Sequence, residues 1–434
     1  MTANTLKSRT VSRISYYALS ALNYLSFLLL GDVFLVDVLQ YAGFHDGAIG
    51  IVTSASGFVT FVQILLLFVG HKIRKHKAVI LFGFTGMGAM FALAYVIALC
   101  PFDTQLKQIL IIACILLGRL IVNFASPLLD IFKYTFISYQ ERGAVSATNS
   151  TISLATAIVF TLAIGEVRDY YRESGNVEQG LFVTAIFLII VAILTAISVA
   201  MMRGSSKEAY GSKPVTGIQE ILRNTLGHKS FVSMLLFYIL WQVASTITNS
   251  FMGVYKLNEL QFSIGTVQII STVSNVVAML LARPLGKLSD KHSHSLYLKF
   301  ALMAHVVAFL IIALTAPETS WLVFVHAMIS GIAGIVLSAC FFNMLLEFTG
   351  PTYYMYGIAL INCISGVCGF GISFGAAWLL ELIQSAGNTL FGMKVYAQQI
   401  LSAISAVITL GLLGYAHFIL TKLPKQQLTD AKEE

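Results

Sequence analysis

The sequence predicts an all-α integral membrane protein with twelve transmembrane helices, arranged as two six-helix bundles related by pseudo-two-fold symmetry. Three observations predict this fold class: the composition, the spacing of long apolar segments, and a pattern that recurs in the two halves of the chain. Of the 434 residues, 57% are hydrophobic and 11% are charged, whereas soluble proteins contain about 25% charged residues. A soluble fold of this length could not cover so much apolar surface.

Twelve apolar segments are long enough to cross a hydrocarbon core of about 30 Å. Backbone polar groups must be hydrogen-bonded inside lipid, and these segments are far too long for barrel strands, so we expect helices. The first six lie near 14–42, 46–69, 78–99, 108–132, 144–165 and 181–202. The second six lie near 231–254, 263–285, 297–315, 320–346, 354–383 and 395–421.

The distribution of basic residues predicts the orientation. Twelve spans place both termini on one side, and 21 of the 27 Lys and Arg residues fall on that side, against five on the other. By the positive-inside rule, both termini are expected in the cytoplasm. We expect a plasma membrane location, in a bacterial inner membrane. The formal charge of +7 is then explained by basic loops at an anionic leaflet, without a nucleic-acid partner.

The first segment follows a basic stretch but does not match a signal peptide. It is too long, it contains Asn23, Asp32 and Asp37, and no small-residue cleavage pattern follows it. Asp37 is expected at the outer interface, without a role. The five cysteines are odd in number and have no metal-ligand spacing. They are expected to be packing residues, and no metal site is predicted.

The longest polar connection divides the chain into halves. The predicted domains are an N-terminal half at 1–202, a linker at 203–230, a C-terminal half at 231–421 and a cytoplasmic tail at 422–434. In the linker, Ile218, Ile221 and Leu222 share one helical face, which predicts an interfacial amphipathic helix. A tether between the halves and a regulatory element are both compatible with this pattern.

The two halves repeat a pattern. Ala48-Ile49-Gly50 opens the second span and Ser263-Ile264-Gly265 opens the eighth. Gly70 and Gly286 follow in short basic loops at 20 and 21 residues. Halves related in this way, with a site at their shared interface, are typical of secondary transporters.

Several motifs together resemble the major facilitator superfamily. The stretch 283–291, Arg-Pro-Leu followed by GKLSDK, resembles the GxxxD(R/K) signature of that family. Glu141-Arg142-Gly143 resembles the family's entry to the fifth span. The residues 342–347 and 356–366 resemble its tenth and eleventh spans. The resemblance covers essentially the whole chain and implies the family's fold of two six-helix halves.

The resemblance also implies a cytoplasmic gate made of charged residues. Gly286 allows a tight turn, and Asp290, beside Lys291, would pair with Arg142 at the start of the fifth span. Arg283 and Glu347 would extend this network, which must break in the inward-facing state. The alternative is that these residues are surface charges that only set the topology.

The first half departs from the family pattern. Arg74, not an aspartate, occupies the position equivalent to Asp290, and the loop at 350–356 contains no Lys or Arg. One gate pair is therefore expected to be intact and the other rewired, with Arg74 reaching Asp130 or Glu347. A purely structural role is the alternative for Asp130.

Ionisable residues at membrane depth are costly and are candidates for function. Arg119 lies close to the middle of the fourth span, and Asp32 lies near the middle of the first. At about 1.5 Å per residue, their offset is within reach of an Arg side chain. In the family the first and fourth spans line the central cavity. Arg119 is therefore predicted to bind substrate, or to form a structural ion pair, and Asp32 is the candidate for proton coupling.

The second half offers polar residues without charge. Gln242 and Asn249 are seven residues apart and share a helical face. The predicted substrate-binding residues are Arg119, Asn123, Asn23, Trp241, Gln242, Asn249, Asn343 and Asn362. Hydrogen bonds between packed helices are the alternative role for this group. His305 and His326, also at membrane depth, are either titrating groups or satisfied buried histidines.

No enzyme site emerges, since no phosphate-binding loop, HExxH motif or nucleophile elbow is present. We expect an alternating-access secondary transporter, coupled to H⁺, that carries a small polar or anionic organic solute, works as a monomer among membrane lipids and needs no cofactor. The alternative is an exporter or flippase of amphipathic compounds such as drugs or lipids. The fifth span, 143–165, lacks the Gly-Pro-rich motif that drug exporters of the superfamily carry. A receptor or scaffold would require longer extramembrane segments.

Overall fold

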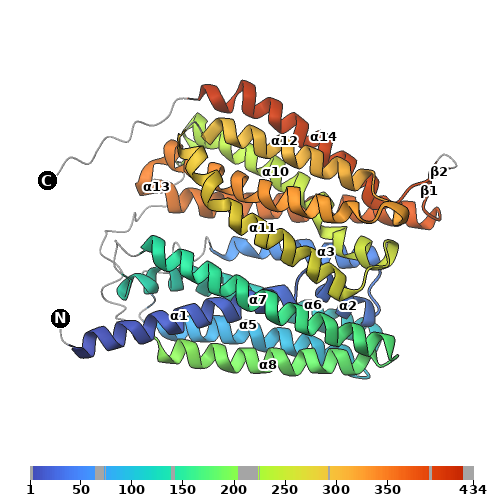
Figure 1. Cartoon of the computed structure of the whole chain (residues 1–434), viewed down its shortest axis with the longest axis horizontal. Helices are drawn as coiled ribbons and strands as arrows, with labels where there is room; N and C mark the ends of the chain where they lie inside the picture. The colour runs from blue at the N-terminus through green and yellow to red at the C-terminus, as the bar shows by residue number, and fades with distance from the viewer. Residues whose placement is uncertain are drawn as a thin grey trace. The chain divides into compact units, whose positions relative to one another are not determined.

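The computed structural model describes residues 3–63, 73, 75–137, 142–203, 223, 225–291, 294–390 and 393–423. Nearly all of these residues are helical (Figure 1). Within the helices, some side chains lie outside the description, among them those of Asp32, Arg142, Arg283, Asp290 and Lys291.

The chain divides into two compact units. Unit 1 contains Met1–Pro214 and Phe262–Gln268, and unit 2 contains Val215–Gln261 and Ile269–Glu434. Helix α11, Ile264–Lys291, therefore begins in unit 1 and continues in unit 2.

Unit 1 is built from long helices joined by short turns. Its elements are α1 (Ala3–Leu29), α2 (Asp32–Tyr41), α3 (Asp46–Phe58), the 3₁₀ turn η1 (Val59–Phe61), α5 (His76–Leu99), α6 (Thr104–Phe132), the 3₁₀ turn η3 (Lys133–Thr135), α7 (Arg142–Glu173) and α8 (Val177–Met201).

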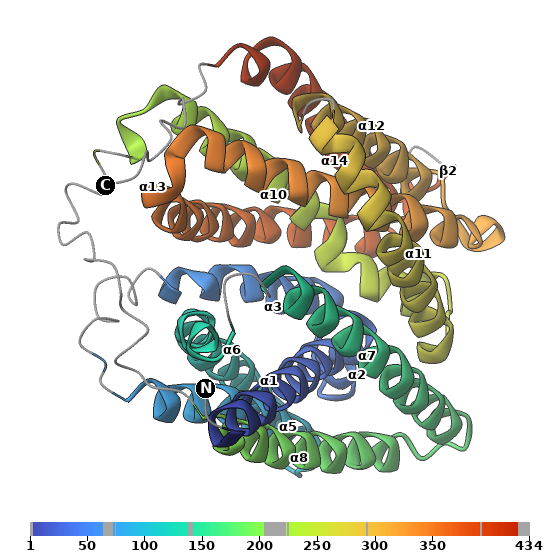
Figure 2. The same ribbon diagram turned by 60° about the vertical axis from the view of Figure 1, so that its left-hand side comes forward.

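Small residues set the packing of α5 within unit 1. Helix α5 packs against both α6 and α8, while α1 packs against α7 and α8 (Figure 2). A Cβ atom on Gly83 would lie 2.2 Å from the Cβ of Ala125 in α6, and one on Gly88 would lie 3.0 Å from the Cβ of Ala192 in α8. Glycine and alanine at these contacts let the backbones approach closely, as is common in membrane helix pairs.

The first predicted span is broken. Helix α1 ends at Leu29, α2 begins at Asp32, and the two are bent by 49° relative to each other. Gly31 between them is extended, with φ −133° and ψ 168°. A Cβ atom on Gly31 would lie 3.0 Å from the carbonyl oxygen of Phe27, so the break favours a residue without a side chain.

Unit 2 contains α10 (Lys229–Val254), the π-helical turn η5 (Tyr255–Glu259), most of α11, α12 (His294–Ala313), the 3₁₀ turn η6 (Pro317–Thr319), α13 (Leu322–Ser385), α14 (Ala397–Phe418) and the 3₁₀ turn η7 (Leu420–Lys422). Strands β1 (Thr389–Leu390) and β2 (Met393–Lys394) pair antiparallel, with Thr389 opposite Lys394.

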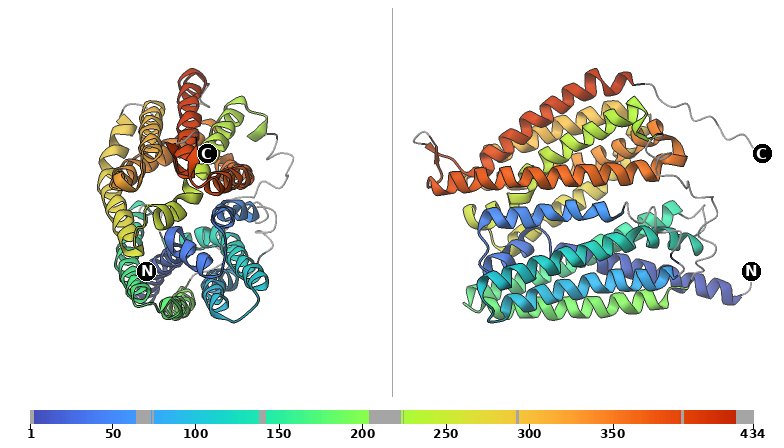
Figure 3. Two further views of the ribbon diagram at one scale, coloured as in Figure 1. Left: turned by 90° about the vertical axis from the view of Figure 1, so that its right-hand side faces the viewer. Right: turned by 180° about the vertical axis from the view of Figure 1, so that it is seen from behind.

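Helix α13 serves as two spans. Its 64 residues would be about 96 Å long if straight, which is far more than a bilayer is thick. The ribbon folds back near its label in Figure 2, and residues 322–345 and 356–385 each qualify as a span. Helix α12 packs against α13 and α14, as does α10, and their core includes Phe231, Phe237 and Phe341 (Figure 3).

The described residues confirm an all-helical chain built from apolar segments of spanning length. Within them, ten helices are long and apolar enough to cross a membrane, and the bent pair of α1 and α2 adds an eleventh span. The remaining predicted span, 46–69, begins with α3 and η1 and then leaves the described residues. Four expectations stay predictions: the count of twelve spans, the symmetry of the two bundles, the domain boundaries and the linker helix at 203–230.

Candidate functional site

The break in the first span leaves backbone carbonyl groups without their helical hydrogen bonds, and side chains of the surrounding helices donate to them instead. The hydroxyl of Tyr95 in α5 donates to the carbonyl of Leu29 at 2.9 Å and lies 3.4 Å from that of Phe34. The guanidinium of Arg119 in α6 donates to the carbonyl of Leu30 at 2.8 Å. Buried backbone groups must find partners, so these two side chains replace the helical bonds that the break removes.

Arg119 lies beside two aromatic rings. Its Cζ atom is 5.4 Å from the ring centre of Phe27 and 5.9 Å from that of Phe91. The side chain is half-buried. Among the described side chains, no carboxylate lies within ion-pair distance of Arg119. The predicted pair with Asp32 falls on a side chain that is not described.

A strip of amides continues along α6 from Arg119. Asn123, one turn further on, donates to the carbonyl of Arg119 at 2.8 Å and accepts a hydrogen bond from Gln63 at 3.1 Å. Asn123 was predicted from the sequence, whereas Gln63 was not, although it too is a polar residue within a predicted span. Asn23, one turn before Phe27 on α1, is half-buried, and its buried Oδ1 atom has no hydrogen-bond partner among the described residues. These side chains form the candidate site in unit 1.

A buried ion cluster at the end of α2 was not predicted. Asp37 pairs with both Arg168 and Arg172 of α7. The side chains of Asp37 and Arg168 are only 3% and 1% exposed. Arg168 also lies 3.4 Å from the hydroxyl of Thr184 in α8 and 6.0 Å from the ring of Tyr95. The expectation that Asp37 is unremarkable was wrong, because two cations on successive turns of α7 hold it buried inside unit 1. Its place at the outer interface stays a prediction.

The corresponding polar residues of unit 2 are engaged in packing. Trp241 lies edge-on to His305, with 4.6 Å between ring centres, and near Phe309. Nδ1 of His305 lies 2.9 Å from the carbonyl of Ala301, and Nδ1 of His326 lies 2.9 Å from that of Ala308. Each histidine therefore has a backbone partner, in line with the interpretation of satisfied buried histidines.

The amide side chains of unit 2 divide between packing and exposure. Gln242 lies 3.3 Å from the hydroxyl of Thr246, and a Cβ atom on Gly369 of α13 would lie 3.1 Å from its Cγ atom. Asn249 is exposed and donates to Ser245 at 2.9 Å. Asn343 and Asn362 are half-buried in α13. Gln242 is therefore part of the α10–α13 contact and is half-buried, as Asn343 and Asn362 are, whereas Asn249 is the exposed amide of the group.

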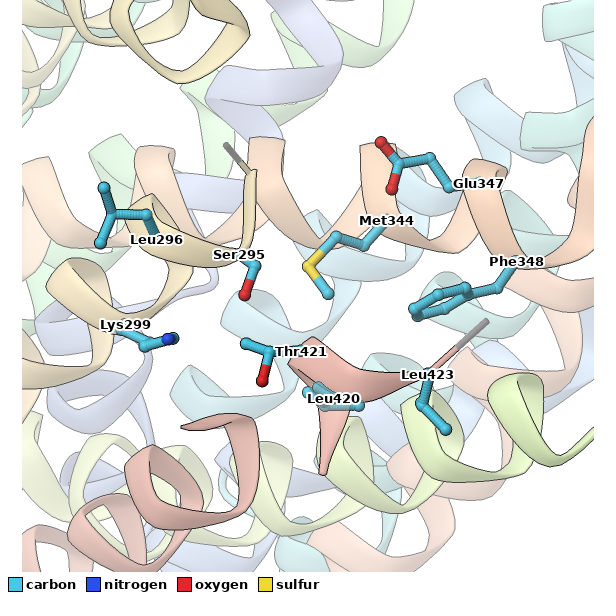
Figure 4. Close-up of a pocket in the computed structure, with 9 residues that line it drawn as sticks. All are labelled: Ser295, Leu296, Lys299, Met344, Glu347, Phe348, Leu420, Thr421 and Leu423. Atoms are coloured by element: carbon cyan, nitrogen blue, oxygen red, sulfur yellow. The ribbon is translucent and has the colours of Figure 1, made fainter. Parts of the chain in front are cut away.

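A small cavity lies at one end of unit 2. Its volume is about 260 Å³, and Figure 4 shows Lys299, Glu347, Ser295 and Thr421 around it, with Met344 and Phe348 among its apolar residues. Nζ of Lys299 lies 3.4 Å from Nδ1 of His417. Glu347, a predicted gate residue, thus lies among mixed polar and apolar groups of its own unit.

Most of the predicted gate falls outside the description. The position of Arg74, the side chains of Arg142, Arg283, Asp290 and Lys291, and the surroundings of Gly286 are not described. Asp130 is described, and it forms a 2.6 Å ion pair with Lys133, one turn away. The gate pair of Asp290 with Arg142 therefore stays a prediction, as does the rewired partner of Arg74.

The described residues contain no group of three or more His, Cys, Asp or Glu side chains placed to hold a metal ion. All five cysteines are described and are free thiols.

Solved structures with the same fold cover almost the whole chain. The nucleoside transporter NupG has a TM-score of 0.71 at 15% identity, and the match covers 95% of this chain and 99% of that one. A bacterial homologue of the human lysosomal transporter Spinster, in an inward-facing and unoccupied conformation, has a TM-score of 0.68 at 13% identity, with 94% and 96% covered. Tetrameric PepTSo2 has a TM-score of 0.64 at 14% identity, with 95% and 98% covered.

No curated protein matches significantly. A family model described as Major Facilitator Superfamily matches residues 16–376, which is most of the chain. The family and these structural neighbours are transporters and not enzymes, as the sequence predicted. With its apolar helices, the protein is a multi-pass membrane transporter. The chain belongs to the Major Facilitator Superfamily.

Proposed function

We propose that the protein is an alternating-access secondary transporter, coupled to protons, that carries a small organic solute with an anionic group. One observation carries this proposal. Arg119 lies at membrane depth beside a break in the first span, and among the described side chains no carboxylate pairs with it.

A cation in this position has several donors to offer. An Arg side chain has five N–H donors, and among the described residues one hydrogen bond from Arg119 is observed, to the carbonyl of Leu30. A charged side chain inside a membrane is costly unless a partner compensates it. A carboxylate or phosphate group could accept two parallel hydrogen bonds from the guanidinium. An anionic solute would therefore supply a partner that the described side chains do not provide.

The groups around Arg119 favour a solute with an apolar or aromatic body. Phe27 and Phe91 border the guanidinium, and Asn23 and Asn123 add amides on the adjoining turns of α1 and α6. The buried Oδ1 atom of Asn23 has no partner among the residues that the structure describes, so a donor on the solute would satisfy it. In unit 2, Trp241, Gln242, Asn249, Asn343 and Asn362 remain candidates from the sequence.

Asp32 is the proposed proton-coupling group. It opens α2, two residues beyond the carbonyl that Arg119 binds. Its protonation could thus affect the same break in the first span. In proteoliposomes, Asp32→Asn is expected to abolish uptake driven by a pH gradient. Exchange of solute across the membrane at equal pH on both sides should stay intact. Loss of both activities, or of neither, would remove Asp32 from this role.

The same proposal includes the gate of Asp290 with Arg142, the cytoplasmic location of both termini, a bacterial inner membrane and a monomeric state. The similar structures include a nucleoside transporter and a bacterial homologue of the human drug peptide transporters. Nucleosides and peptides are polar organic solutes, and of the two only peptides carry a carboxylate, as the proposed class requires.

The experiment is a thermal-shift screen of purified protein with metabolites, drugs and lysolipids at two pH values. We expect organic anions to stabilise the wild type and to lose this effect in Arg119→Ala. Lys107→Ala is the matched control, since Lys107 is a cation on the same helix, about three turns earlier. Stabilisation by lipids or hydrophobic cations alone, equal in both proteins, would contradict the proposal and favour an exporter of amphipathic compounds.

A further inference from the structure

The start of α11 is held by an acidic side chain of α7. Asp169 accepts hydrogen bonds from the backbone N–H groups of Ile264 and Gly265, at 2.9 and 2.6 Å. All three residues belong to unit 1. The contact joins two segments almost one hundred positions apart in the sequence, and it bears on the Ser263-Ile264-Gly265 motif that opens the eighth predicted span.

The first turn of a helix has four N–H groups without partners in the helix. In α11, Asp169 accepts from Ile264 and Gly265, and the hydroxyl of Ser263 accepts from Thr266 at 3.1 Å. The next N–H group, of Val267, makes the first helical bond, to the carbonyl of Ser263 at 3.2 Å. Asp169 thus accepts two of these three capping bonds. Its negative charge also interacts favourably with the positive end of the helix dipole.

Glycines bring the two helices together at this point. A Cβ atom on Gly165, one turn before Asp169, would lie 3.4 Å from the Cα atom of Gly265. A Cβ atom on Gly265 would lie 2.8 Å from the Oδ2 atom of Asp169. A side chain at position 265 would therefore displace the carboxylate, so the glycine is required for the cap.

The same turn of α7 has a second contact. Arg168 and Arg172, on either side of Asp169, bind Asp37 of α2. This turn therefore ties the first residues of α11 to the outer part of the broken first span. The Arg168 contact is buried, whereas Ser263 beside the Asp169 cap is exposed. Water can reach the cap and replace Asp169 when the helices separate.

We propose that Asp169 is a positioning residue of the transport cycle, which clamps the first turn of α11 to α7 in one state and releases it in the other. This inference rests on the proposed alternating-access function, because each end of such a transporter must open in turn. Helix α11 has 28 residues and a length of about 42 Å. The predicted gate residue Asp290 lies near the other end of α11. Asp169 would therefore hold the first turn of the helix in one state of the cycle, and Asp290 would hold the opposite end in the other state.

A cysteine at position 268 reports on the clamp. Gln268 is 7% exposed, and its Cγ atom lies 3.4 Å from the position of a Cβ atom on Gly165. We would introduce Gln268→Cys after replacing the five native cysteines with alanine and measure its maleimide labelling rate in lipid nanodiscs. Exposed Glu173 provides a control reporter, Glu173→Cys, whose labelling should be the same in every variant.

Asp169→Ala should raise the labelling rate of Gln268→Cys about tenfold, because two charge-assisted hydrogen bonds are lost. Asp169→Asn should give a smaller increase, since its amide nitrogen cannot accept from the second N–H group. Gly265→Ala tests the same contact from α11 and should also raise the rate. Glu166→Gln changes a second carboxylate at this contact, whose Oε1 atom would lie 3.2 Å from a Cβ atom on Gly265. Among the described residues it accepts no hydrogen bond from the first turn of α11, and glutamine keeps its shape, so this variant should have no effect.

Unchanged labelling in both Asp169→Ala and Gly265→Ala, with normal unfolding temperatures, would overturn the clamp. An equal increase in Glu166→Gln would also overturn it, since the effect would then be general. The measurement needs no substrate. Failure of the clamp would leave anion binding by Arg119 untouched, and failure of anion binding would leave the labelling result unchanged.

Discussion

The first helices of the two units differ in how their backbone carbonyl groups are hydrogen-bonded. In unit 1 the first span breaks at Gly31, and Tyr95 and Arg119 bind the carbonyls of Leu29 and Leu30. In unit 2, α10 runs unbroken from Lys229 to Val254 and continues into a π-helical turn.

The difference extends to charge. Unit 1 buries Asp37 with Arg168, and it places Arg119 beside the break. In α10, Thr248 donates to Ser405 of α14 at 2.8 Å, and Ser405 lies 2.7 Å from the carbonyl of Ala244. Unit 1 thus combines an interrupted helix with ionic groups, whereas unit 2 uses neutral hydroxyls across an intact one. An anionic solute is therefore expected to depend on unit 1 for its charge recognition.

The largest effect is expected from Asp37→Ala. This change leaves Arg168 buried without a counterion, and breaking a buried pair from one side costs about 3–5 kcal/mol. The comparison in unit 2 is Ser405→Ala, which removes a neutral hydroxyl, and such hydrogen bonds contribute about 0.6 kcal/mol in membrane proteins. Thermal unfolding in detergent should rank the two variants in that order. Equal losses would mean that the ionic cluster is no more important than the hydroxyls.

A smaller effect is expected from Tyr95→Phe, and Tyr255→Phe in unit 2 provides its match. Removing the Tyr95 hydroxyl leaves the Leu29 carbonyl without that partner, at a cost of about 1–3 kcal/mol. The hydroxyl of Tyr255 binds the carbonyl of Thr315 at 2.6 Å, but Gln399 binds the same carbonyl at 2.7 Å. Tyr95→Phe should therefore lower the unfolding temperature further than Tyr255→Phe. The reverse order would show that the break does not depend on Tyr95.

The smallest effect is expected from Asp130→Asn. Asp130 pairs with Lys133, but its side chain is 56% exposed, and exposed pairs contribute about 0–1 kcal/mol. The unfolding temperature should stay close to that of the wild type. A loss as large as that of Asp37→Ala would imply that Asp130 belongs to a larger network, as the predicted gate requires.

Much of the fold could be predicted from the sequence, because crossing lipid demands long apolar helices whose signal is local. The break at Gly31 was not predicted, since hydropathy is nearly continuous through 14–42 and the bend depends on which side chains satisfy the freed carbonyls. A single sequence does not show that Tyr95 and Arg119, far along the chain, reach those groups.

The candidate site was predicted in part for the same reason. Arg119 and Asn123 were found because a charge and an amide at membrane depth are conspicuous in the sequence. Arg168 and Arg172 were counted as loop charges on one side, and Asp37 was assigned to the interface. Their spacing of four residues on α7 is visible in the sequence, but the partner of both is more than 130 positions away.

The most direct test of this asymmetry is uptake of a stabilising organic anion into proteoliposomes by the wild type, Arg119→Ala and Lys107→Ala. Loss of the cation in Arg119→Ala should raise the solute concentration that gives half-maximal uptake by more than about tenfold, or 1.4 kcal/mol. Lys107→Ala should match the wild type. Equal uptake by all three proteins would contradict the claim that the charge of unit 1 recognises the solute.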